Sequence, residues 1–347
     1  MVQNLVPLNK RTKILHYPMS DVAKVKLGLG RAAYISKIDL KAGFFNVPLA
    51  ESSRRYTAFS CAAGRFFWRR MTMGMCNAPA HFQWVMEDVL RGQPTDPKLM
   101  TSILLDDVTV AEDDVDRNVD DAAEAIGRLC RAGAMVGLYK GVVGASEAEF
   151  MGERWYSGGY FRPPSGKAAA LLQLGDDALA NMPRAQLYGM LSYWRQFIPD
   201  FSAKTSKVRK LLSQDAGEWT PAHTQEVRKV LQELLEGAPC INFDPQAPVL
   251  LETHTGPKGL GAICLQEDPA SSRWLPVASF SRTLEGMDTT RSPILLELMA
   301  IQEGLHKMVQ VVIFAADLRL AVTPALMALQ KAKAKLHPDL LWRLCDI

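Results

Sequence analysis

The sequence predicts an α+β protein, because segments with the spacing of strands are interspersed with segments with the spacing of helices. Residues 33–40 alternate apolar and polar side chains, as a half-buried strand does. Residues 102–112 hold two short β-prone runs around a polar pair, which is typical of a β-hairpin. Residues 186–197 repeat large apolar side chains at helical spacing, at Leu187, Met190, Leu191 and Trp194.

The length and composition allow two or three compact domains, since 48% of the 347 residues are hydrophobic. With a net charge of +3, a nucleic-acid-binding role must rest on local clusters of charge. The six cysteines lack the paired spacing of a zinc or disulfide framework, which fits a reducing compartment. The sequence shows neither a signal peptide nor a run long enough to span a membrane, so we expect a soluble, intracellular protein.

The N-terminal part leads to a carboxylate at the end of a strand. We expect a short helix from residues 20–21, and the strand at 33–40 then delivers Asp39 near its end. Gly43 and Phe44 follow shortly after. A lone aspartate at a strand end is usually a cap and a phenylalanine usually belongs to the core. A carboxylate followed by a glycine and an aromatic also suits the wall of a nucleotide pocket.

Residues 51–83 interleave basic and aromatic side chains more densely than the rest of the chain. Cations that bind phosphates, with aromatic rings between them, suit a nucleic-acid surface built from strands. An amphipathic hairpin with solvated arginines fits the composition equally well. A turn at Gly74 and Asn77 follows, and Pro79 then favours the start of a helix that runs to Leu90.

The hairpin at 102–112 places two carboxylates, Asp106 and Asp107, side by side. Like charges held close oppose each other's ionisation, and a divalent cation relieves that cost. Mg²⁺ suits such a pair, because it binds one or two carboxylates and takes its other ligands from water and phosphates. A solvated turn remains the alternative for an isolated pair of this kind.

The C-terminal half begins with amphipathic helices at 186–197 and 225–235. A basic cluster between them is either a surface that tracks phosphates or a solvated helix face; it consists of Lys204, Lys207, Arg209 and Lys210. The proline-bounded segment at 239–245 suits a domain boundary.

Several blocks of sequence, taken in order, resemble the reverse transcriptase of gypsy-type LTR retrotransposons. The first three are Asp39-Leu-Lys-Ala-Gly-Phe-Phe, Met71-Thr-Met-Gly-Met-Cys-Asn-Ala-Pro-Ala-His-Phe-Gln83 and Leu104-Leu-Asp-Asp107. The later ones include Glu149-Phe-Met-Gly152, Leu191-Ser-Tyr-Trp-Arg-Gln-Phe-Ile-Pro-Asp-Phe-Ser202 and Gly259-Leu-Gly-Ala262. The resemblance extends over essentially the whole chain and implies a right-hand polymerase followed by an RNase H-like domain.

The resemblance implies nucleotidyl transfer by two Mg²⁺ or Mn²⁺ ions about 3.5–4 Å apart. It assigns Asp39 and Asp106 as ligands of both ions, with Asp107 as the third catalytic and metal-site carboxylate. It also implies contacts to substrate from Phe44, which abuts the sugar, from Met73, Gly74 and Gln83 near the incoming base and template, and from Phe150, Met151 and Gly152 in the primer grip. Lys140 matches a lysine of the family, where a solvated lysine fits almost as well.

The chain also departs from the family pattern. Leu104 stands where the family has a tyrosine, Thr72 replaces a proline and Gly141 replaces a cysteine. The chain begins about where the later finger strands would, so we expect the basic residues that clamp the triphosphate to be missing, with Lys10, Arg11 and Lys13 lying past that position. Because the three carboxylates are kept, the change at Leu104 predicts that polymerase activity is impaired rather than lost.

Residues 248–264 resemble the first hairpin of an RNase H domain, with His254 in place of a catalytic aspartate. Glu297, at the head of a helix expected at 297–309, and Asp317, after the apolar run at 311–314, match two further catalytic positions. The chain stops before the last carboxylate would arrive. Because neutral histidine prefers softer metals than Mg²⁺, we interpret His254, Glu297 and Asp317 as relics of an inactive nuclease.

We therefore predict partial fingers and a palm in residues 1–160, a helical thumb or connection in 161–244 and a truncated RNase H-like α/β domain in 245–347. The predicted function is RNA-directed DNA polymerisation on an RNA or DNA template with a DNA primer and dNTPs, without a membrane partner. The rival is a catalytically inactive retroelement-derived protein that at most binds nucleic acid; an unrelated metal-dependent phosphotransferase is a third option. A homodimer or other subunits of the polyprotein, and a cytoplasmic virus-like particle or nuclear location, stay open.

Overall fold

The computed structural model describes residues 3–18, 22–93, 99, 101–213, 217–256 and 259–321. By its internal contacts the chain divides into two compact units. The first holds Met1–Met151 and Trp155–Gly159, and the second holds Gly152–Arg154 and Tyr160–Ile347. In the described part of the chain, no helix combines the length and apolarity that crossing a membrane requires.

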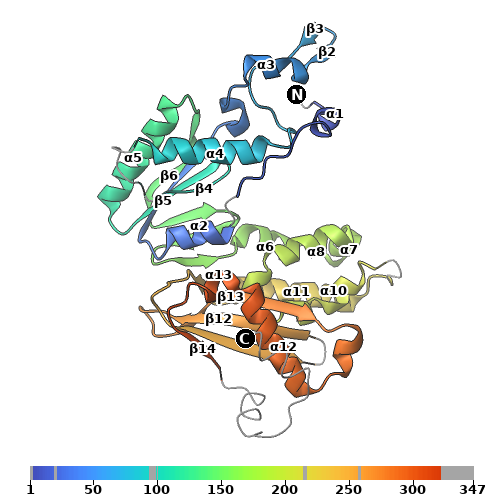
Figure 1. Ribbon diagram of the computed structural model, residues 1–347. Helices are drawn as coiled ribbons and strands as arrows, with labels where there is room; N and C mark the ends of the chain where they lie inside the picture. Colours follow the sequence, from blue (N-terminus) through green and yellow to red (C-terminus); the bar gives the residue numbers. More distant parts are fainter. Residues whose placement is uncertain are drawn as a thin grey trace. The chain divides into compact units, whose positions relative to one another are not determined.

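The first unit is built on an antiparallel sheet with the strand order β4-β5-β1-β6 (Figure 1). Its strands are β1 (Tyr34–Leu40), β4 (Thr101–Leu104), β5 (Asp107–Glu112) and β6 (Val136–Ala145). The strand expected at 33–40 and the hairpin expected at 102–112 are thus confirmed. Ile38, Val108 and Val110 are almost fully buried, which is why these runs read as apolar or alternating in the sequence.

Two helices, α4 (Ala78–Arg91) and α5 (Val115–Arg131), pack against this sheet. The helix expected from Pro79 to Leu90 is confirmed as α4, with the proline in its first turn. Helix α5 begins at an N-cap, because the side chain of Asp114 accepts a hydrogen bond from the backbone N–H of Arg117. Phe82 and Leu129 are fully buried where the helices meet the sheet.

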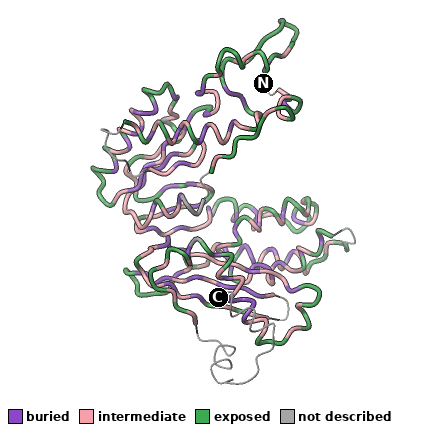
Figure 2. The backbone as a smooth tube through the Cα atoms, viewed as in Figure 1, coloured by how far each residue is buried: buried purple, intermediate pink, exposed green. Residues whose placement is uncertain are grey.

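Short elements complete this unit: α1 (Val6–Asn9), α2 (Val22–Leu29), the 3₁₀ turn η1 (Gly43–Asn46), α3 (Glu51–Arg54), η2 (Arg55–Thr57), β2 (Phe59–Cys61) and β3 (Gly64–Phe66). The helix expected from residues 20–21 corresponds to α2, although those two residues themselves lie outside the described ones. Strands β2 and β3 form an exposed hairpin, green in Figure 2. Strand β7 (Glu147–Phe150) also belongs to this unit, β8 (Glu153–Tyr156) falls at the division, and β9 (Tyr160–Arg162) pairs with β10 (Cys240–Ile241) within the second unit.

The second unit contains a helical layer with its own core. Its helices are α6 (Ser165–Leu172), α7 (Asp176–Asn181), α8 (Arg184–Tyr193), the 3₁₀ turn η3 (Arg195–Phe197), α9 (Phe201–Lys204), α10 (Ser206–Lys210) and α11 (Pro221–Glu236). The helix expected at 186–197 therefore ends earlier than predicted, at Tyr193, and continues as a 3₁₀ turn. Leu187, Leu191 and Trp194 are buried, as their helical spacing predicts. The helix expected at 225–235 lies within α11.

The other part of this unit is a sheet with the order β13-β12-β11-β14, covered by α12 (Pro293–Lys307). Its strands are β11 (Val249–Gly256), β12 (Gly259–Glu267), β13 (Trp274–Thr283) and β14 (Leu318–Leu320). The hairpin expected at 248–264 is confirmed by the antiparallel register of β11 and β12. The helix expected at 297–309 corresponds to α12, which begins earlier, at Pro293, and ends at Lys307; the short helix α13 (Val309–Val312) follows it.

Polar contacts join the helical layer to this sheet inside the second unit. Arg195 donates a hydrogen bond to the backbone O of Ser281 in β13, and Ser202 Oγ donates to the same oxygen at 3.0 Å. Tyr160 also donates to the side chain of Asp268, which follows β12. The expected boundary at residue 160 lies next to the observed division, whereas the one at 244 falls within a single compact unit.

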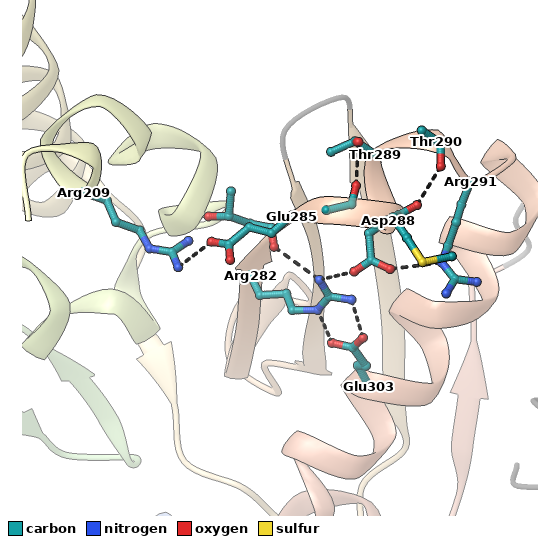
Figure 3. Close-up of polar contacts among 11 residues, drawn as sticks. Arg209, Arg282, Glu285, Asp288, Thr289, Thr290, Arg291 and Glu303 are labelled. Carbon is teal, nitrogen blue, oxygen red and sulfur yellow. Dashed lines mark hydrogen bonds and ion pairs between the residues drawn. The ribbon is translucent and has the colours of Figure 1, made fainter. Parts of the chain in front are cut away.

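A network of charges links the end of β13 to helix α12 (Figure 3). Arg282 makes two hydrogen bonds to the carboxylate of Glu303 in α12, and a third to Asp288 in the 3₁₀ turn η4 (Gly286–Thr290). Asp288 in turn pairs with Arg291 at 3.0 Å. Paired, multiply hydrogen-bonded charges of this kind fix three elements in one geometry.

Candidate active site

Strands β1 and β5 bring two of the predicted carboxylates together. Asp39 is the direct partner of Asp107 in the antiparallel register, so both side chains leave the same face of the sheet. On its other side Asp39 pairs with Gly137 of β6. The strand ends therefore place Asp39 between a second carboxylate and a residue with no side chain.

The third carboxylate, Asp106, lies in the turn between β4 and β5. The residue before it, Leu105, has a φ of +54°, which is a left-handed conformation rarely adopted by a branched side chain. The backbone N–H of Leu40 donates to the carbonyl of Asp106 at 3.2 Å, which ties the turn to the end of β1. This turn holds Asp106 beside the Asp39–Asp107 pair.

The side chain of Gln83 in α4 forms hydrogen bonds with the backbone of this turn. Its side chain is fully buried, its Oε1 accepts from the backbone N–H of Leu105 at 3.0 Å, and its Nε2 donates to the carbonyl of Ile103 at 3.1 Å. The expected contact of Gln83 with substrate stays a prediction, and in this structure its side chain bonds the backbone of the turn. A buried amide that satisfies two backbone groups stabilises the strained turn.

Two glycines keep space beside the carboxylates. A Cβ atom on Gly43 would lie 3.4 Å from Oδ1 of Asp106 and only 2.9 Å from Cζ of Phe82. A Cβ atom on Gly137 would lie 3.0 Å from Oδ2 of Asp39. We call the space around Asp39, Asp106 and Asp107 the carboxylate cradle. It stays open beside Asp39 and Asp106 because Gly137 and Gly43 carry no side chain.

The three carboxylates of the cradle have one nearby cation, Lys37, among the contacts that the structure describes. Partial desolvation, followed by repulsion from Asp107 and Asp39, raises the pKa of Asp106 above its usual range, although the residue is exposed at the turn. Lys37, two residues before Asp39, supplies a cation: its Nζ lies 3.4 Å from Oδ1 of Asp107. The site therefore concentrates negative charge at Asp106 and offsets it at Asp107.

The carboxylates suit a hard divalent cation. Within the described residues, no three histidine, cysteine or acidic side chains are already arranged as ligands of one metal ion. Mg²⁺ needs no such closed protein cage, because one or two carboxylates and phosphate oxygens of a substrate suffice. The raised pKa of Asp106 and the cradle kept by Gly43 and Gly137 fit such an ion.

The residues expected around the nucleotide have different surroundings. Phe44 in η1 packs edge-on against Phe82, with ring centroids 5.4 Å apart. Met73 is 54% exposed, and Gly74 has a φ of +92°. Asn9 of α1 holds this loop by donating to the carbonyl of Gly74 at 2.7 Å.

The expected primer grip is a tight turn after β7. Met151 and Gly152 both have positive φ, of +49° and +69°, as the two central residues of a hairpin turn often do. Phe150, just before them, is 2% exposed, so its ring supports the turn from inside. A Cβ atom on Gly152 would collide with the hydroxyl of Tyr193, which makes glycine necessary there.

The three residues expected as nuclease relics are separated by the sheet. His254 of β11 is the direct partner of Gly261 in β12. Both lie on the face of the sheet that meets Asp200: a Cβ atom added to Gly261 would lie 3.4 Å from Oδ1 of Asp200, and Nε2 of His254 lies 3.8 Å from its Oδ2. Helix α12, which carries Glu297 in its second turn, packs on the opposite face, since its Gly304 contacts Leu251 and Ala262. His254 therefore points away from the helix that carries Glu297.

Asp317 also differs from the expectation. It comes just before β14, and its carbonyl accepts from the backbone N–H of Val249 at the start of β11, whereas His254 lies near the end of that strand. In the parallel register of β11 and β14 these positions are several residues apart, so Asp317 does not lie beside His254. Its carboxylate pairs with Arg319 instead.

Sequence reasoning missed Lys37 and Gly137. Lys37 could have been found from strand alternation, because residues two apart share a face and Lys37 precedes Asp39 by two. No local signal identifies Gly137, whose role depends on the pairing of β6 with β1.

The chain matches two protein-family models. One is described as reverse transcriptase (RNA-dependent DNA polymerase) and matches residues 2–152; the other is the RNase H-like domain found in reverse transcriptase and matches residues 219–316. Similar proteins include the Transposon Tf2-3 and Tf2-7 polyproteins of Schizosaccharomyces pombe, each 26% identical over 306 residues. These matches cover 88% of this chain but only 22% of each polyprotein.

Solved structures share the fold. The foamy viral protease-reverse transcriptase in complex with dsDNA matches with a TM-score of 0.82 at 21% identity, over 99% of this chain and 71% of that one. The same viral protein with an RNA/DNA hybrid matches with a TM-score of 0.79 at 20% identity, over 99% and 46% of the two chains. The two matched domains and the polyprotein relatives identify the chain as the reverse transcriptase and RNase H-like region of a gypsy-type retrotransposon polyprotein, and the solved structures share its fold.

Proposed function

We propose that this chain is an RNA-directed DNA polymerase module that extends a DNA primer on an RNA or DNA template with dNTPs. The observation that carries the proposal is the pairing of Asp39 with Asp107 across β1 and β5, with Asp106 in the adjoining turn. The match of residues 2–152 to the reverse transcriptase family supports it. The related viral protein bound to dsDNA and to an RNA/DNA hybrid supports nucleic acid as the partner.

In this proposal Asp39 and Asp106 hold the divalent ions, Mg²⁺ or Mn²⁺. When bound, such ions activate the primer hydroxyl and neutralise the charge that develops on the phosphates. The protein contributes position: β1 fixes Asp39, Gln83 fixes the turn of Asp106, and Gly43 leaves room beside it. Fixed placement of reacting groups supplies much of the rate in reactions of this type.

The surrounding predicted residues would orient the substrates. Phe44, whose ring packs edge-on against Phe82, would contact the sugar of the nucleotide. The exposed Met73 and the neighbouring Gly74 would face the incoming base and template. The turn at Met151 and Gly152 would hold the primer end, with Phe150 as its buried support.

We propose that the RNase H-like part is structural. His254 stands where the family has a catalytic aspartate, and it lies on the sheet face opposite α12 and Glu297. Asp317 is bonded at the other end of β11. A hydrolytic metal cluster needs several acidic ligands at one place, and these three positions do not supply it.

The test is primer extension on an RNA template with a DNA primer and dNTPs, in Mg²⁺ and again in Mn²⁺. Asp39→Asn and the pair Asp106→Asn with Asp107→Asn should lower extension by at least about 10³-fold, because they remove the anchor of the metal ions. Asp113→Asn, an exposed aspartate just beyond β5, is the matched control and should leave extension unchanged.

Extension that persists in the Asp106→Asn/Asp107→Asn protein would refute the assignment of these carboxylates. A folded wild-type chain that binds primer-template without extending it would support the alternative, a catalytically inactive protein that binds nucleic acid. Leu104, in place of the family's tyrosine beside the turn, is the residue that favours this alternative.

A further inference from the structure

Lys37 connects the carboxylate cradle to the strand that leads into the expected primer grip. It lies on β1 two residues before Asp39, so its side chain leaves the same face of the sheet. Its direct partner across the sheet is Thr109 of β5, which places Asp107 one diagonal step away. The distance from Nζ of Lys37 to Oδ1 of Asp107 is 3.4 Å.

The same ammonium group reaches strand β7. Lys37 Nζ donates to the carbonyl of Glu149 at 3.4 Å, and it lies 6.0 Å from the centroid of the Phe150 ring. Glu149 and Phe150 directly precede the turn at Met151 and Gly152. The ammonium group of Lys37 thus contacts both Asp107 and strand β7, which leads into the turn.

Partial burial strengthens the attraction between Lys37 and Asp107. The side chains of Lys37 and Asp107 are 19% and 30% exposed, so water screens their attraction less than at a typical surface pair. Asp106, by contrast, lies exposed in the turn among like charges. A carboxylate already bound by an ammonium group is a poorer ligand for a divalent cation than a neighbour without that partner.

We propose that Lys37 is a positioning residue that holds Asp107 in an ion pair, leaves Asp39 and Asp106 to hold the divalent ions, and fixes β7 relative to them. The inference rests on the proposed polymerase function. Asp107 then acts through its contact with Lys37 and through its charge, and β7, which leads into the primer-grip turn, keeps a constant distance from the carboxylates that hold the ions.

The first measurement is steady-state primer extension by the full chain carrying Lys37→Gln, Lys37→Arg or the control Lys229→Gln, which changes an exposed lysine of α11. Lys37→Gln should lower kcat about 10- to 100-fold, as expected for misplaced reacting groups. The KM for dNTP should change less than about threefold, since nucleotide binding is not removed. Lys37→Arg keeps the charge and should restore most of kcat, and Lys229→Gln should match wild type.

A double-mutant cycle tests whether Lys37 acts through Asp107. If it does, the protein with both Lys37→Gln and Asp107→Asn should lose less than the product of the two single losses, because the Lys37–Asp107 contact is already absent in Asp107→Asn and only the contact to Glu149 remains to be lost. Losses that multiply in the double variant would overturn the proposal, as would a kcat for Lys37→Gln equal to that of the control.

The second measurement is independent of catalysis: binding of Mn²⁺ alone, followed by electron paramagnetic resonance. Lys37→Gln should bind Mn²⁺ at least about threefold more tightly than wild type, because a nearby positive charge is gone and Asp107 is released. Asp106→Asn should weaken Mn²⁺ binding far more than Asp107→Asn does. Equal weakening by these two aspartate variants would overturn the division of roles, even if the wild-type chain extends no primer and the polymerase function itself fails.

Discussion

Asp39 and Asp107 lie directly opposite each other in the antiparallel pairing of β1 and β5. The register of the two strands brings them together, and the neighbouring pair of that register, Ile38 and Val108, is buried on the opposite face of the sheet. Asp106 joins them because the turn places it next to Asp107. The core thus gathers like charges that the folded chain would otherwise avoid.

The metal-free protein should therefore be more stable when Asp106 is neutral. The pKa of Asp106 is raised in the folded state by desolvation and by Asp107 and Asp39, so its ionised form opposes folding. Its destabilising effect is absent below the pKa of the unfolded chain, near 4, and grows as pH rises through the higher folded pKa. Asp106→Asn should raise the free energy of unfolding at pH 7 by less than about 1 kcal/mol, because the residue is exposed.

Urea unfolding at pH 7 and at pH 3.5, in EDTA, measures this effect. The gain from Asp106→Asn should be present at pH 7 and vanish at pH 3.5, while Asp113→Asn should show no such pH dependence. A variant that is less stable than wild type at pH 7 would show that Asp106 makes a favourable contact in the metal-free state.

Gly43→Ala should destabilise the fold and block the site. Its Cβ would lie 2.9 Å from the fully buried ring of Phe82, so the ring or the backbone must move, at a cost of about 1–3 kcal/mol. The same atom would crowd Asp106 and should lower primer extension as well. Thermal unfolding and extension assays measure the two effects.

Gly189→Ala is the matched control for that substitution. Gly189 lies within α8 and no atom would meet its added Cβ within 4 Å. Because glycine is a poor helix former, the change should stabilise the helix by about 0.5–1 kcal/mol and leave extension unchanged. If both glycine variants change stability in the same direction, crowding at Gly43 is not the cause.

Gln83→Leu should loosen the turn that carries Asp106. It removes the partners of the Leu105 N–H and the Ile103 carbonyl, both part-buried or buried, and should cost about 2–4 kcal/mol of unfolding free energy. We expect kcat for extension to fall more than the KM for dNTP rises, because the buried Gln83 acts through the turn that carries Asp106. A rise in KM alone would instead support direct contact between Gln83 and the nucleotide.

Much of the fold around the site follows from local sequence. Alternation at 33–40 and the paired runs at 102–112 identified both strands that carry the carboxylates, because their pattern is set by one buried face. The proline at residue 79 located the start of α4 to within a residue. These elements are set by short-range rules, and the structure keeps them.

The rest depended on contacts between distant segments. Gln83 belongs to a family motif, but only the packing of α4 beneath the turn shows that it binds backbone. The place of Asp317 also depends on pairing between distant segments, because its carbonyl accepts from the backbone N–H of Val249 at the start of β11.

Arg282→Met should destabilise the second unit without affecting the carboxylate cradle. It breaks the two hydrogen bonds to Glu303 and the one to Asp288 (Figure 3), and should cost about 1–3 kcal/mol because these side chains are only 20–30% exposed. Burial opposes it, but hydrogen bonds and charge from Arg282 and Arg291 hold the pKa of Asp288 below its usual range. That contribution is present above the unfolded pKa, near 4, and is lost as pH falls through the folded pKa, so the difference between wild type and variant should shrink below about pH 4.

Arg319→Met, which breaks the more exposed pair with Asp317, should cost less than about 1 kcal/mol in the same urea experiment. Equal losses in the two variants, or a difference that is constant down to pH 2.5, would show that the network adds nothing beyond an ordinary surface pair.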